Sequence, residues 1–374
     1  MCGGTRYHYY EFGNKTSKLL AWQIRKETSD KFIHSILTED SRLLDKSESI
    51  NSEFKQFYED LYKTGQDAEN TGEKRFMDGI TLPKLQDEDR ELLDVDISEM
   101  EVLQAINSLQ NNKTPGPDGF PVEYYKAFSK KLLTPLTNMI KEALENKKLP
   151  ESLEIATITL LPKPGKDKQK CDSYRPLSLL NADYKILSKL VALRLEDVIP
   201  KIIHADQTGF VKNRHGADNV RRLLHILNTK FTQYVKTLFN APKANILTND
   251  VLSNTFSLSR GCRQDCPSSP LLFAIAIEPL AIAIRSDTSI AGIKFGTSEH
   301  KLSLYADDLL LYISGPYTSV PPLLKCLKEY SAVSGYKLNY TKSEILPLNI
   351  QDNNIRALTD PLKWCNSGFK YLGI

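Results

Sequence analysis

Two adjacent carboxylates, Asp307 and Asp308, are the residues of this 374-residue sequence that are best suited to chemistry. They stand between two short runs rich in Leu, Tyr and Ile, in the segment 301–314, which reads K-L-S-L-Y-A-D-D-L-L-L-Y-I-S. Such runs are typical of the two strands of a β-hairpin, with the acids at its tip. Mg²⁺ takes oxygen ligands, and a pair of such ions can hold the attacking and leaving oxygens of a phosphoryl transfer. Because Asp is also a common turn residue, a solvated turn is the alternative interpretation.

Basic residues gather in two further stretches. The turn P-K-P-G-K-D-K-Q-K, followed by S-Y-R-P-L-S, carries Lys163, Lys166 and Arg175. These cations could contact phosphates, and a solvated charged turn is the alternative. The stretch Q-T-G-F-V-K-N-R places an aromatic ring beside Lys212 and Arg214. That mixture suits a strand of nucleic acid, but an ordinary basic loop explains it equally well.

The composition limits the classes of protein to which the chain can belong. With 41% hydrophobic and 25% charged residues, it has the balance of a soluble globular protein. The net charge of +3 is small, so any affinity for nucleic acid must come from local basic clusters. Of the six cysteines only Cys262 and Cys266 are close in sequence, and no His stands near them. A zinc site is therefore not expected, and a reduced compartment suits the chain better than a disulfide framework.

Two stretches bear on secretion and membranes. Residues 1–12 contain no apolar run and cannot serve as a secretory signal. The longest apolar run, 271–284, is interrupted by a Glu-Pro pair and is shorter than a bilayer span requires. We therefore expect an intracellular protein of the nucleus, the cytoplasm or both, which is not secreted and has no role in a membrane.

Apolar periodicity predicts the helices around these motifs. They are expected at 22–37, 49–62, 98–111, 132–144, 181–199, 217–239 and 323–333. Ser98 and Glu101 form a capping box at the start of one of them. Ser269 fits the N-cap of a further helix and Pro270 its first position. Pro279 should kink or end the regular part of that helix.

Strands and loops are predicted between these helices. The alternating, β-branched stretch 153–161 is expected to be a strand, and 245–258 a hairpin that turns at Asn249 and Asp250. The run K-T-P-G-P-D-G-F-P at 113–121 must be a rigid turn. Residues 63–79 have almost nothing to bury and are expected to form a flexible connector.

The order of these motifs resembles the reverse transcriptase of LINE-type non-LTR retrotransposons. The matching blocks are T-P-G-P-D-G-F-P, L-L-P-K-P-G-K-D, S-Y-R-P-L-S-L-L-N, Q-T-G-F-V-K-N-R, R-G-C-R-Q-D-C-P-S-S-P-L-L-F, Y-A-D-D, G-Y-K-L-N-Y-T-K-S-E and F-K-Y-L-G-I. One block alone is weak evidence, whereas eight in the right order over residues 95–374 are specific.

The resemblance implies an α+β fold, that of a right-hand polymerase with fingers and a palm sheet. It implies a helical linker region at 1–94, upstream of a reverse transcriptase region at 95–374 with its best-defined core at 145–374. Because the chain stops within the last block, we expect a truncated fragment without a thumb. The implied reaction is RNA-templated DNA synthesis by two-metal nucleotidyl transfer. Mg²⁺ is its metal, and an RNA template, a DNA primer and deoxynucleotide triphosphates are its partners.

The resemblance also implies roles for individual residues. Asp307 would be a Mg²⁺ ligand with Asp308 beside it, and Lys342 is a candidate proton donor to the leaving pyrophosphate. The positions implied to bind the nucleotide are Lys163, Lys166, Arg175 and Gln264. The positions implied to contact nucleic acid are Lys212, Arg214, Tyr305 and Tyr371.

The chain departs from the family pattern between Arg214 and Arg260. The family has there a palm strand with the block Asp-x-x-x-Ala-Phe-Asp and a further catalytic Asp, whereas this stretch contains only the acids Asp218 and Asp250. Continuous helical periodicity across 225–231 is what an internal deletion of that strand would leave. We therefore expect a palm sheet that lacks one strand and a catalytically defective copy. The alternative is a non-catalytic remnant that binds RNA or an RNA/DNA duplex.

Two further positions depart from the family. Asp265 stands where the family has Gly, and Ser268 replaces a usual Leu. We expect Asp265 to place a negative side chain where backbone should approach the nucleotide.

Overall fold

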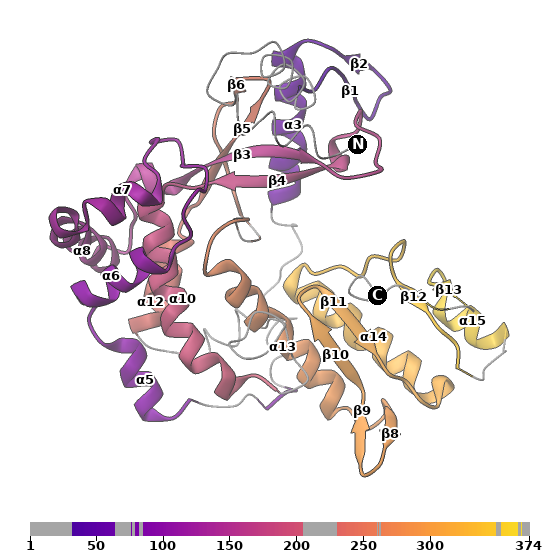
Figure 1. Cartoon of the computed structure of the whole chain (residues 1–374). Helices are drawn as coiled ribbons and strands as arrows, with labels where there is room; N and C mark the ends of the chain where they lie inside the picture. Colours follow the sequence, from indigo (N-terminus) through magenta and orange to yellow (C-terminus); the bar gives the residue numbers. More distant parts are fainter. Residues whose placement is uncertain are drawn as a thin grey trace, which may run out of the picture. The chain divides into compact units, whose positions relative to one another are not determined.

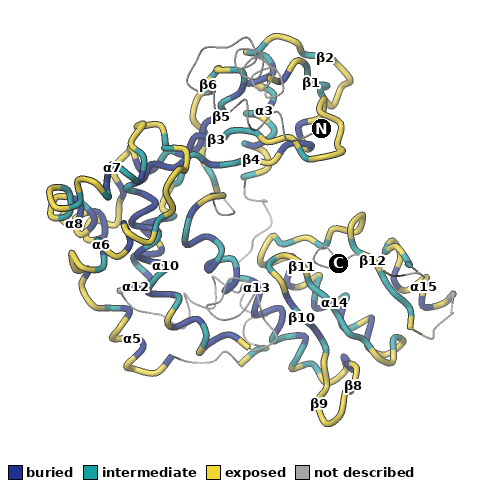
Figure 2. Tube along the Cα trace, in the orientation of Figure 1, coloured by how far each residue is buried: buried dark blue, intermediate teal, exposed yellow. Residues whose placement is uncertain are grey.

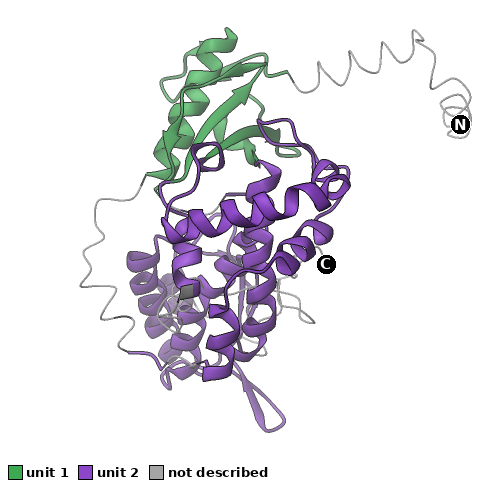
Figure 3. Cartoon of the chain, turned by 90° about the vertical axis from the view of Figure 1, so that its left-hand side faces the viewer, with its two compact units in different colours: residues 1–63, 155–179, 242–259 green, residues 64–154, 180–241, 260–374 purple. Residues whose placement is uncertain are grey.

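The computed structural model describes most of the chain between residues 32 and 368. The described residues are 32–63, 76, 79–81, 85–204, 230–259, 261, 263–348, 353–365 and 368. The chain divides into two compact units, each built from several separate stretches of sequence (Figure 3). Unit 1 comprises residues 1–63, 155–179 and 242–259, and unit 2 comprises residues 64–154, 180–241 and 260–374.

Unit 1 is built on a five-stranded sheet, in which four strands have the order β4-β3-β5-β6 (Figure 1). The fifth strand, β7, also pairs with β5. The strands are β3 (Ile155–Pro162), β4 (Tyr174–Leu179), β5 (Lys243–Thr248), β6 (Val251–Leu252) and β7 (Phe256–Ser257). β3 pairs antiparallel with β4 and parallel with β5. The hairpin of β5 and β6 turns at Asn249 and Asp250, whose φ angles of 47° and 61° suit a two-residue turn. The predicted strand and the predicted hairpin are thus confirmed.

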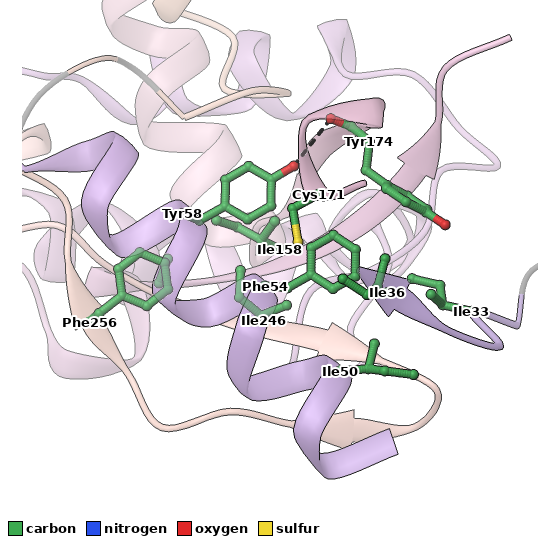
Figure 4. Close-up of a cluster of buried hydrophobic side chains, with 11 residues drawn as sticks. Ile33, Ile36, Ile50, Phe54, Tyr58, Ile158, Cys171, Tyr174, Ile246 and Phe256 are labelled. Atoms are coloured by element: carbon green, nitrogen blue, oxygen red, sulfur yellow. Dashed lines mark hydrogen bonds between the residues drawn. The ribbon is translucent and has the colours of Figure 1, made fainter. Parts of the chain in front are cut away.

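One helix, α3 (Ser47–Tyr62), packs on this sheet through a buried hydrophobic cluster (Figure 4). The buried members of the cluster are Ile33, Ile36, Ile50, Phe54, Tyr58, Ile158, Cys171, Tyr174, Ala244, Ile246 and Phe256. Buried polar groups fix the helix further. The Tyr58 hydroxyl donates to the backbone oxygen of Tyr174 at 3.3 Å, and the Asn51 amide donates to that of Ile246 at 3.0 Å. The predicted helix at 49–62 is confirmed, and it is an integral part of the sheet unit.

The predicted helix at 22–37 is wrong where the structure describes it. Residues 36 and 37 form strand β1 (Ile36–Leu37), which pairs antiparallel with β2 (Leu43–Leu44); residues 22–31 lie outside the described part. Ile33 and Ile36 have helical spacing, but they reach the core from an extended backbone. The predicted boundary near residue 94 also does not coincide with the two compact units, because residues 32–63 join the sheet built from residues 155–179 and 242–259. As a statement about the family's domains, that boundary stays a prediction.

The first part of unit 2 is helical. Its helices are α5 (Asp87–Asp94), α6 (Glu99–Ser108), α7 (Val122–Ala127), α8 (Ser129–Glu145), α9 (Glu151–Glu154), α10 (Ala182–Ile202) and α12 (Lys230–Leu238). Buried residues recur along α10 (Figure 2). Its Arg194 binds the Glu101 carboxylate at 2.8 Å and the backbone oxygen of Leu93 at 2.8 Å, which ties α10 to α6 and α5.

Most of the helices predicted here are confirmed. They include those at 98–111, 132–144 and 181–199, and the capping box of Ser98 and Glu101 is present. Of the helix predicted at 217–239, the structure describes α12, and residues 217–229 lie outside the described part.

The second part of unit 2 joins two helices to a hairpin. These elements are α13 (Ser269–Ser286), β10 (Leu302–Tyr305), β11 (Asp308–Leu311) and α14 (Pro316–Ser334). Ile284 of α13, Leu304 of β10 and Leu323 of α14 belong to one buried cluster. The predicted hairpin and the predicted helix at 323–333 are confirmed, although α14 begins earlier, at Pro316.

Helix α13 passes the test of length and apolar composition for a membrane span. It runs on through Pro279, so the expectation that the apolar run is too short is wrong and Pro279 does not end the helix; the alternative, a kink at Pro279, stays a prediction. Inside unit 2, however, 61% of the tested window is buried, and the carboxylate of Glu278 pairs with Arg285 at 2.6 Å. These features are those of a core helix. Its N-cap is Ser268, one residue before the predicted Ser269.

The remaining elements are short. They are the 3₁₀ helix η1 (Cys171–Ser173), β8 (Ile293–Phe295), β9 (Ser298–His300), β12 (Glu344–Ile345), α15 (Asn353–Thr359) and β13 (Lys363–Trp364). β8 and β9 form an exposed antiparallel hairpin (Figure 2), and β12 pairs parallel with β13. The structure thus mixes helices and sheets, as expected for an α+β fold. The loss of a palm strand and the lack of a thumb stay predictions.

Candidate active site

The Asp307–Asp308 hairpin has a two-residue turn. Tyr305 and Asp308 are partners across the strands, so that Ala306 and Asp307 form the turn and Asp308 opens β11. The φ of Ala306 is +54°, a left-handed conformation that costs a residue with a Cβ about 1 kcal/mol. Gly is usual at such a position, and strained backbone is often found at functional sites.

The two carboxylates are exposed, and their electrostatics suit a cation. Partial burial and the neighbouring charge of Asp307 raise the pKa of Asp308, while Lys342 opposes the shift. A divalent cation between the two oxygen donors would relieve their repulsion, and carboxylates are ligands that Mg²⁺ prefers. Asp307 and Asp308 therefore fit the implied metal as a pair. Within the described ranges, no group of three or more His, Cys, Asp or Glu residues could hold a metal.

Two side chains from the segment after α14 lie by this hairpin. The hydroxyl of Tyr336 donates to the backbone oxygen of Asp307 at 3.0 Å. Burial and the two carboxylates raise the pKa of Tyr336. Lys342 is exposed, and its charge acts on Asp308. The charge of Lys342 thus reaches Asp308, whereas the role of Lys342 as a proton donor stays a prediction. Tyr336 was missed by sequence reasoning, although it stands in the G-Y-K-L-N block.

Gln264 is exposed in a turn that its neighbours fix firmly. Arg263 is buried, donates to the backbone oxygens of Leu153 and Glu154, and lies 4.9 Å over the ring of Tyr184. On the other side of Gln264, the carboxylate of Asp265 pairs with the ammonium of Lys185 at 2.6 Å. Gln264 is therefore held from both sides, and its contact with a nucleotide stays a prediction.

The structure explains the two departures from the family in this turn. The φ of Asp265 is +68°, a conformation that favours Gly and that Asp tolerates better than most residues. Ser268 is buried, and its hydroxyl accepts a hydrogen bond of 2.9 Å from Ser188 of α10. The sulfur of Cys266 lies 3.0 Å from the same Ser188 hydroxyl. Each polar replacement has thus found a polar partner on α10.

One of the predicted cations in the basic turn of unit 1 binds the backbone of the turn itself. The Lys163 ammonium donates to the backbone oxygen of Asp172 at 2.5 Å and so closes the turn between β3 and β4. Lys166 and Arg175 are exposed. These two side chains are therefore open to a phosphate, and the role of all three in binding nucleotide stays a prediction.

Several predicted site residues lie outside the described part of the chain. They are Lys212, Arg214, Tyr371 and the acid Asp218. Tyr305 is described and is 39% exposed, directly across from Asp308. Asp250 lies in the β5–β6 turn of unit 1 with a φ of 61°.

Asn181, the N-cap of α10, was also missed by sequence reasoning. Its side chain donates to the backbone oxygen of Ser152 at 3.0 Å and accepts from the backbone NH of Asp118 at 3.3 Å. A Cβ on Gly116 would lie 2.3 Å from the Asn181 side-chain oxygen, so only glycine fits there. Asn181, the last residue of the block S-Y-R-P-L-S-L-L-N, is therefore packed against the block T-P-G-P-D-G-F-P. The signal for this contact in the sequence was Gly116, which stands between two prolines.

The family model of the reverse transcriptase (RNA-dependent DNA polymerase) matches residues 161–374. The chain belongs to this family. The predicted similarity to non-LTR retrotransposon reverse transcriptases is confirmed by its relatives.

One relative is the "Transposon TX1 uncharacterized 149 kDa protein" of Xenopus laevis, 28% identical over 94% of this chain and 29% of its own length. The "Probable RNA-directed DNA polymerase from transposon BS" of Drosophila melanogaster is 28% identical over 47% of this chain and 24% of its own length. The "Retrovirus-related Pol polyprotein from type-2 retrotransposable element R2DM" of the same fly is 24% identical over 62% and 24%, respectively. The chain thus spans less than a third of the length of these relatives.

Proposed function

We propose that this chain forms fingers and palm of a LINE-type reverse transcriptase that binds RNA and nucleotide but does not itself carry out nucleotidyl transfer. One observation carries the proposal. Between Arg214 and Arg260 the sequence holds only two acids, Asp218 and Asp250, and no block of the form Asp-x-x-x-Ala-Phe-Asp. Asp250 follows strand β5 by two residues, but it is the second residue of the two-residue β5–β6 turn in unit 1 and does not stand in a block of the family's form.

The size of the electrostatic loss explains the expected defect. A carboxylate attracts a unit positive charge 4 Å away by about 4 kcal/mol at an effective dielectric constant of about 20. A carboxylate shared by two divalent ions supplies several such contributions and fixes their spacing. Asp307 and Asp308 would hold Mg²⁺, which when bound neutralises charge that develops on phosphate oxygens. They are adjacent in sequence and supply ligands from one turn only.

The remaining side chains support the binding part of the proposal. Lys166 and Arg175 present exposed cations on unit 1, and such groups bind phosphates without regard to sequence. On unit 2, Gln264 is exposed beside the Lys185–Asp265 ion pair, and Lys342 stands by the acidic hairpin. The alternative function, a remnant that binds RNA or RNA/DNA duplex without nucleotide, is favoured by the negative charge of Asp265 in this turn.

The test joins a binding assay with a primer-extension assay on the purified chain. We expect RNA binding that weakens as salt rises, and no Mg²⁺-dependent incorporation on a primed RNA template. The double variant Lys166→Gln/Arg175→Gln should weaken RNA binding and reduce the salt slope by about 2. Lys325→Gln, an exposed lysine of α14, serves as the matched control and should change little.

The outcomes distinguish the proposed function from an active polymerase and from a remnant that binds RNA alone. Incorporation by the purified chain would overturn the proposed defect. Binding of deoxynucleotide triphosphates with Mg²⁺, measured by calorimetry, favours the proposal over the remnant, and RNA binding without nucleotide binding favours the remnant. The genomic sequence around codons 225–231 adds an independent check. If it encodes an intact strand block that the present sequence omits, the gene encodes an active enzyme and the defect belongs to this sequence alone.

A further inference from the structure

Three aromatic side chains form a continuous row along α7 and its two flanks. Phe120 and Tyr124 have ring centroids 4.7 Å apart at 37°, and Tyr124 and Phe128 have centroids 5.1 Å apart at 51°. Phe120 and Phe128 are 45% and 48% exposed. Single exposed hydrophobic residues are common on protein surfaces and need no explanation. Three rings in which the middle one contacts both of the others, with both ends exposed, are a feature of a different kind; we call them the aromatic row.

The backbone under the aromatic row is held firmly. The Glu123 carboxylate accepts a hydrogen bond of 2.5 Å from the backbone NH of Asn112. The Lys126 ammonium donates to the backbone oxygen of Leu109 at 2.6 Å. Tyr125 is buried, and its ring lies edge-on to that of Tyr124, with centroids 5.6 Å apart. The rings are therefore presented by a fixed scaffold. Binding of a ligand that stacks on them costs little free energy for ordering the protein.

The charge next to the row is positive. Lys113, Lys130 and Lys131 are exposed. Lys113 follows Asn112, which is bonded to α7, and the other two lysines open α8 directly after Phe128. Of the neighbouring acids, Glu123 accepts from the backbone of Asn112, and Asp118 accepts from the backbone NH of Phe120 at 3.1 Å. Aromatic faces beside mobile cations suit a ligand that combines flat bases with phosphates.

We propose that the aromatic row is a stacking site for the unpaired bases of a single-stranded nucleic acid, with the three lysines following its phosphates. A duplex does not fit this chemistry, because its base faces are already stacked on one another. A protein segment would fit the apolar rings but not the surrounding lysines unless it were acidic. The site rests on the proposed RNA-binding function and adds to it a contribution to the affinity that does not depend on salt.

The experiment measures fluorescence anisotropy of labelled oligonucleotides with the full chain. The probes are single-stranded oligo-U and oligo-dT of 12 nucleotides, about the length that such sites occupy, and an RNA duplex of the same length. The double variant Phe120→Leu/Phe128→Leu removes two rings and keeps the side chains apolar. Phe295→Leu is the matched control, because Phe295 is 83% exposed on the β8–β9 hairpin.

We expect the double variant to bind the single strands about tenfold to a hundredfold more weakly, with an unchanged salt slope and little change for the duplex. The control should bind like the original chain. Equal losses with RNA and DNA indicate that bases alone are read, and a larger loss with RNA indicates an added contact to the 2′-hydroxyl. Unchanged single-strand affinity in the double variant would overturn the proposal.

A second measurement keeps the proposal testable if the variant fails to fold. Ultraviolet crosslinking of oligo-U to the original chain should modify the peptide that contains residues 120–128. Crosslinks confined to other peptides would overturn the site. This failure differs from that of the proposed function, since the Lys166→Gln/Arg175→Gln variant would still lose salt-dependent RNA binding.

Discussion

The loops held by α10 and the Asp307–Asp308 hairpin differ in how their polar groups are partnered. Both contain a residue with a Cβ in left-handed backbone, Asp265 in one and Ala306 in the other. Along one side of α10, Asn181, Lys185 and Ser188 each bind a loop polar group through the contacts described above. The hairpin instead leaves two like charges adjacent and exposed. The loop groups named here are held by polar partners on α10, whereas the two carboxylates that would meet a cation repel each other.

The largest expected effect sharpens this comparison at Gly116. A Cβ there would overlap the side chain and the backbone of Asn181, at 2.3 Å and 2.5 Å. We expect Gly116→Ala to lower the free energy of unfolding by about 2–3 kcal/mol, because the overlap involves backbone that cannot move freely. Chemical denaturation measures it. Gly119→Ala is the control: its φ is +77° but nothing lies within 4 Å, so only about 1 kcal/mol should be lost. Equal losses would refute the packing argument.

The next effect concerns Asp265. Removing its carboxylate leaves the largely buried Lys185 ammonium without its ion-pair partner. We expect Asp265→Ala to cost about 2 kcal/mol of stability. Asp265→Gly loses the same ion pair but gains backbone freedom at a φ of +68°, and should cost about 1 kcal/mol less.

A double-mutant cycle with Lys185→Met isolates the pair. A coupling free energy near zero would show that α10 does not hold the turn through this ion pair. A positive coupling with an unchanged affinity for nucleotide would confine the role of the ion pair to the stability of the turn.

A smaller effect is expected at Tyr336. Its hydroxyl donates to the backbone oxygen of Asp307, an exposed acceptor that water can replace. Tyr336→Phe should therefore cost about 0.5–1 kcal/mol in thermal or chemical unfolding. Tyr340→Phe, at an exposed tyrosine nearby in sequence, should be neutral. A loss above about 3 kcal/mol would mean that the hairpin depends on the segment after α14 far more than its exposure suggests.

The smallest effect is one of protonation at the hairpin. In the folded chain, burial and Asp307 hold the pKa of Asp308 above its usual 3.8. The folded state thus binds more protons than the unfolded state between these two pKa values, and stability falls as pH rises through that window. Asp307→Asn should lower the pKa of Asp308 and flatten this slope. Nuclear magnetic resonance titration of the carboxyl carbons reports both. Mg²⁺ should act in the same direction, and an unchanged pKa in the variant would remove the argument for a paired site.

A feature could be predicted from the sequence when the residues that form it are close together along the chain. The hairpin at 301–314 and the capping box at Ser98 are local, and both were predicted correctly. The partners of Asp265 and Ser268 stand about 80 residues earlier, on α10, and no local pattern signals them. The strand at Ile36 was predicted as helix because its burial comes from a sheet formed later in the chain. The proximity of Lys342 to Asp308 followed from the resemblance alone.

The interleaving of unit 1 has a consequence for how the chain folds as it is synthesised. The apolar face of α3 is complete once residue 62 has been made, but β5, one of the strands that covers it, ends only at residue 248. Strands β3 and β4 are made by residue 179, but the sheet that buries Ile50, Phe54 and Tyr58 is complete only nearly 190 residues after α3 ends. Such non-local closure slows folding and leaves apolar surface open to other chains. Unit 1 should therefore fold late, and a chaperone that binds α3 during translation would be well placed to raise the yield.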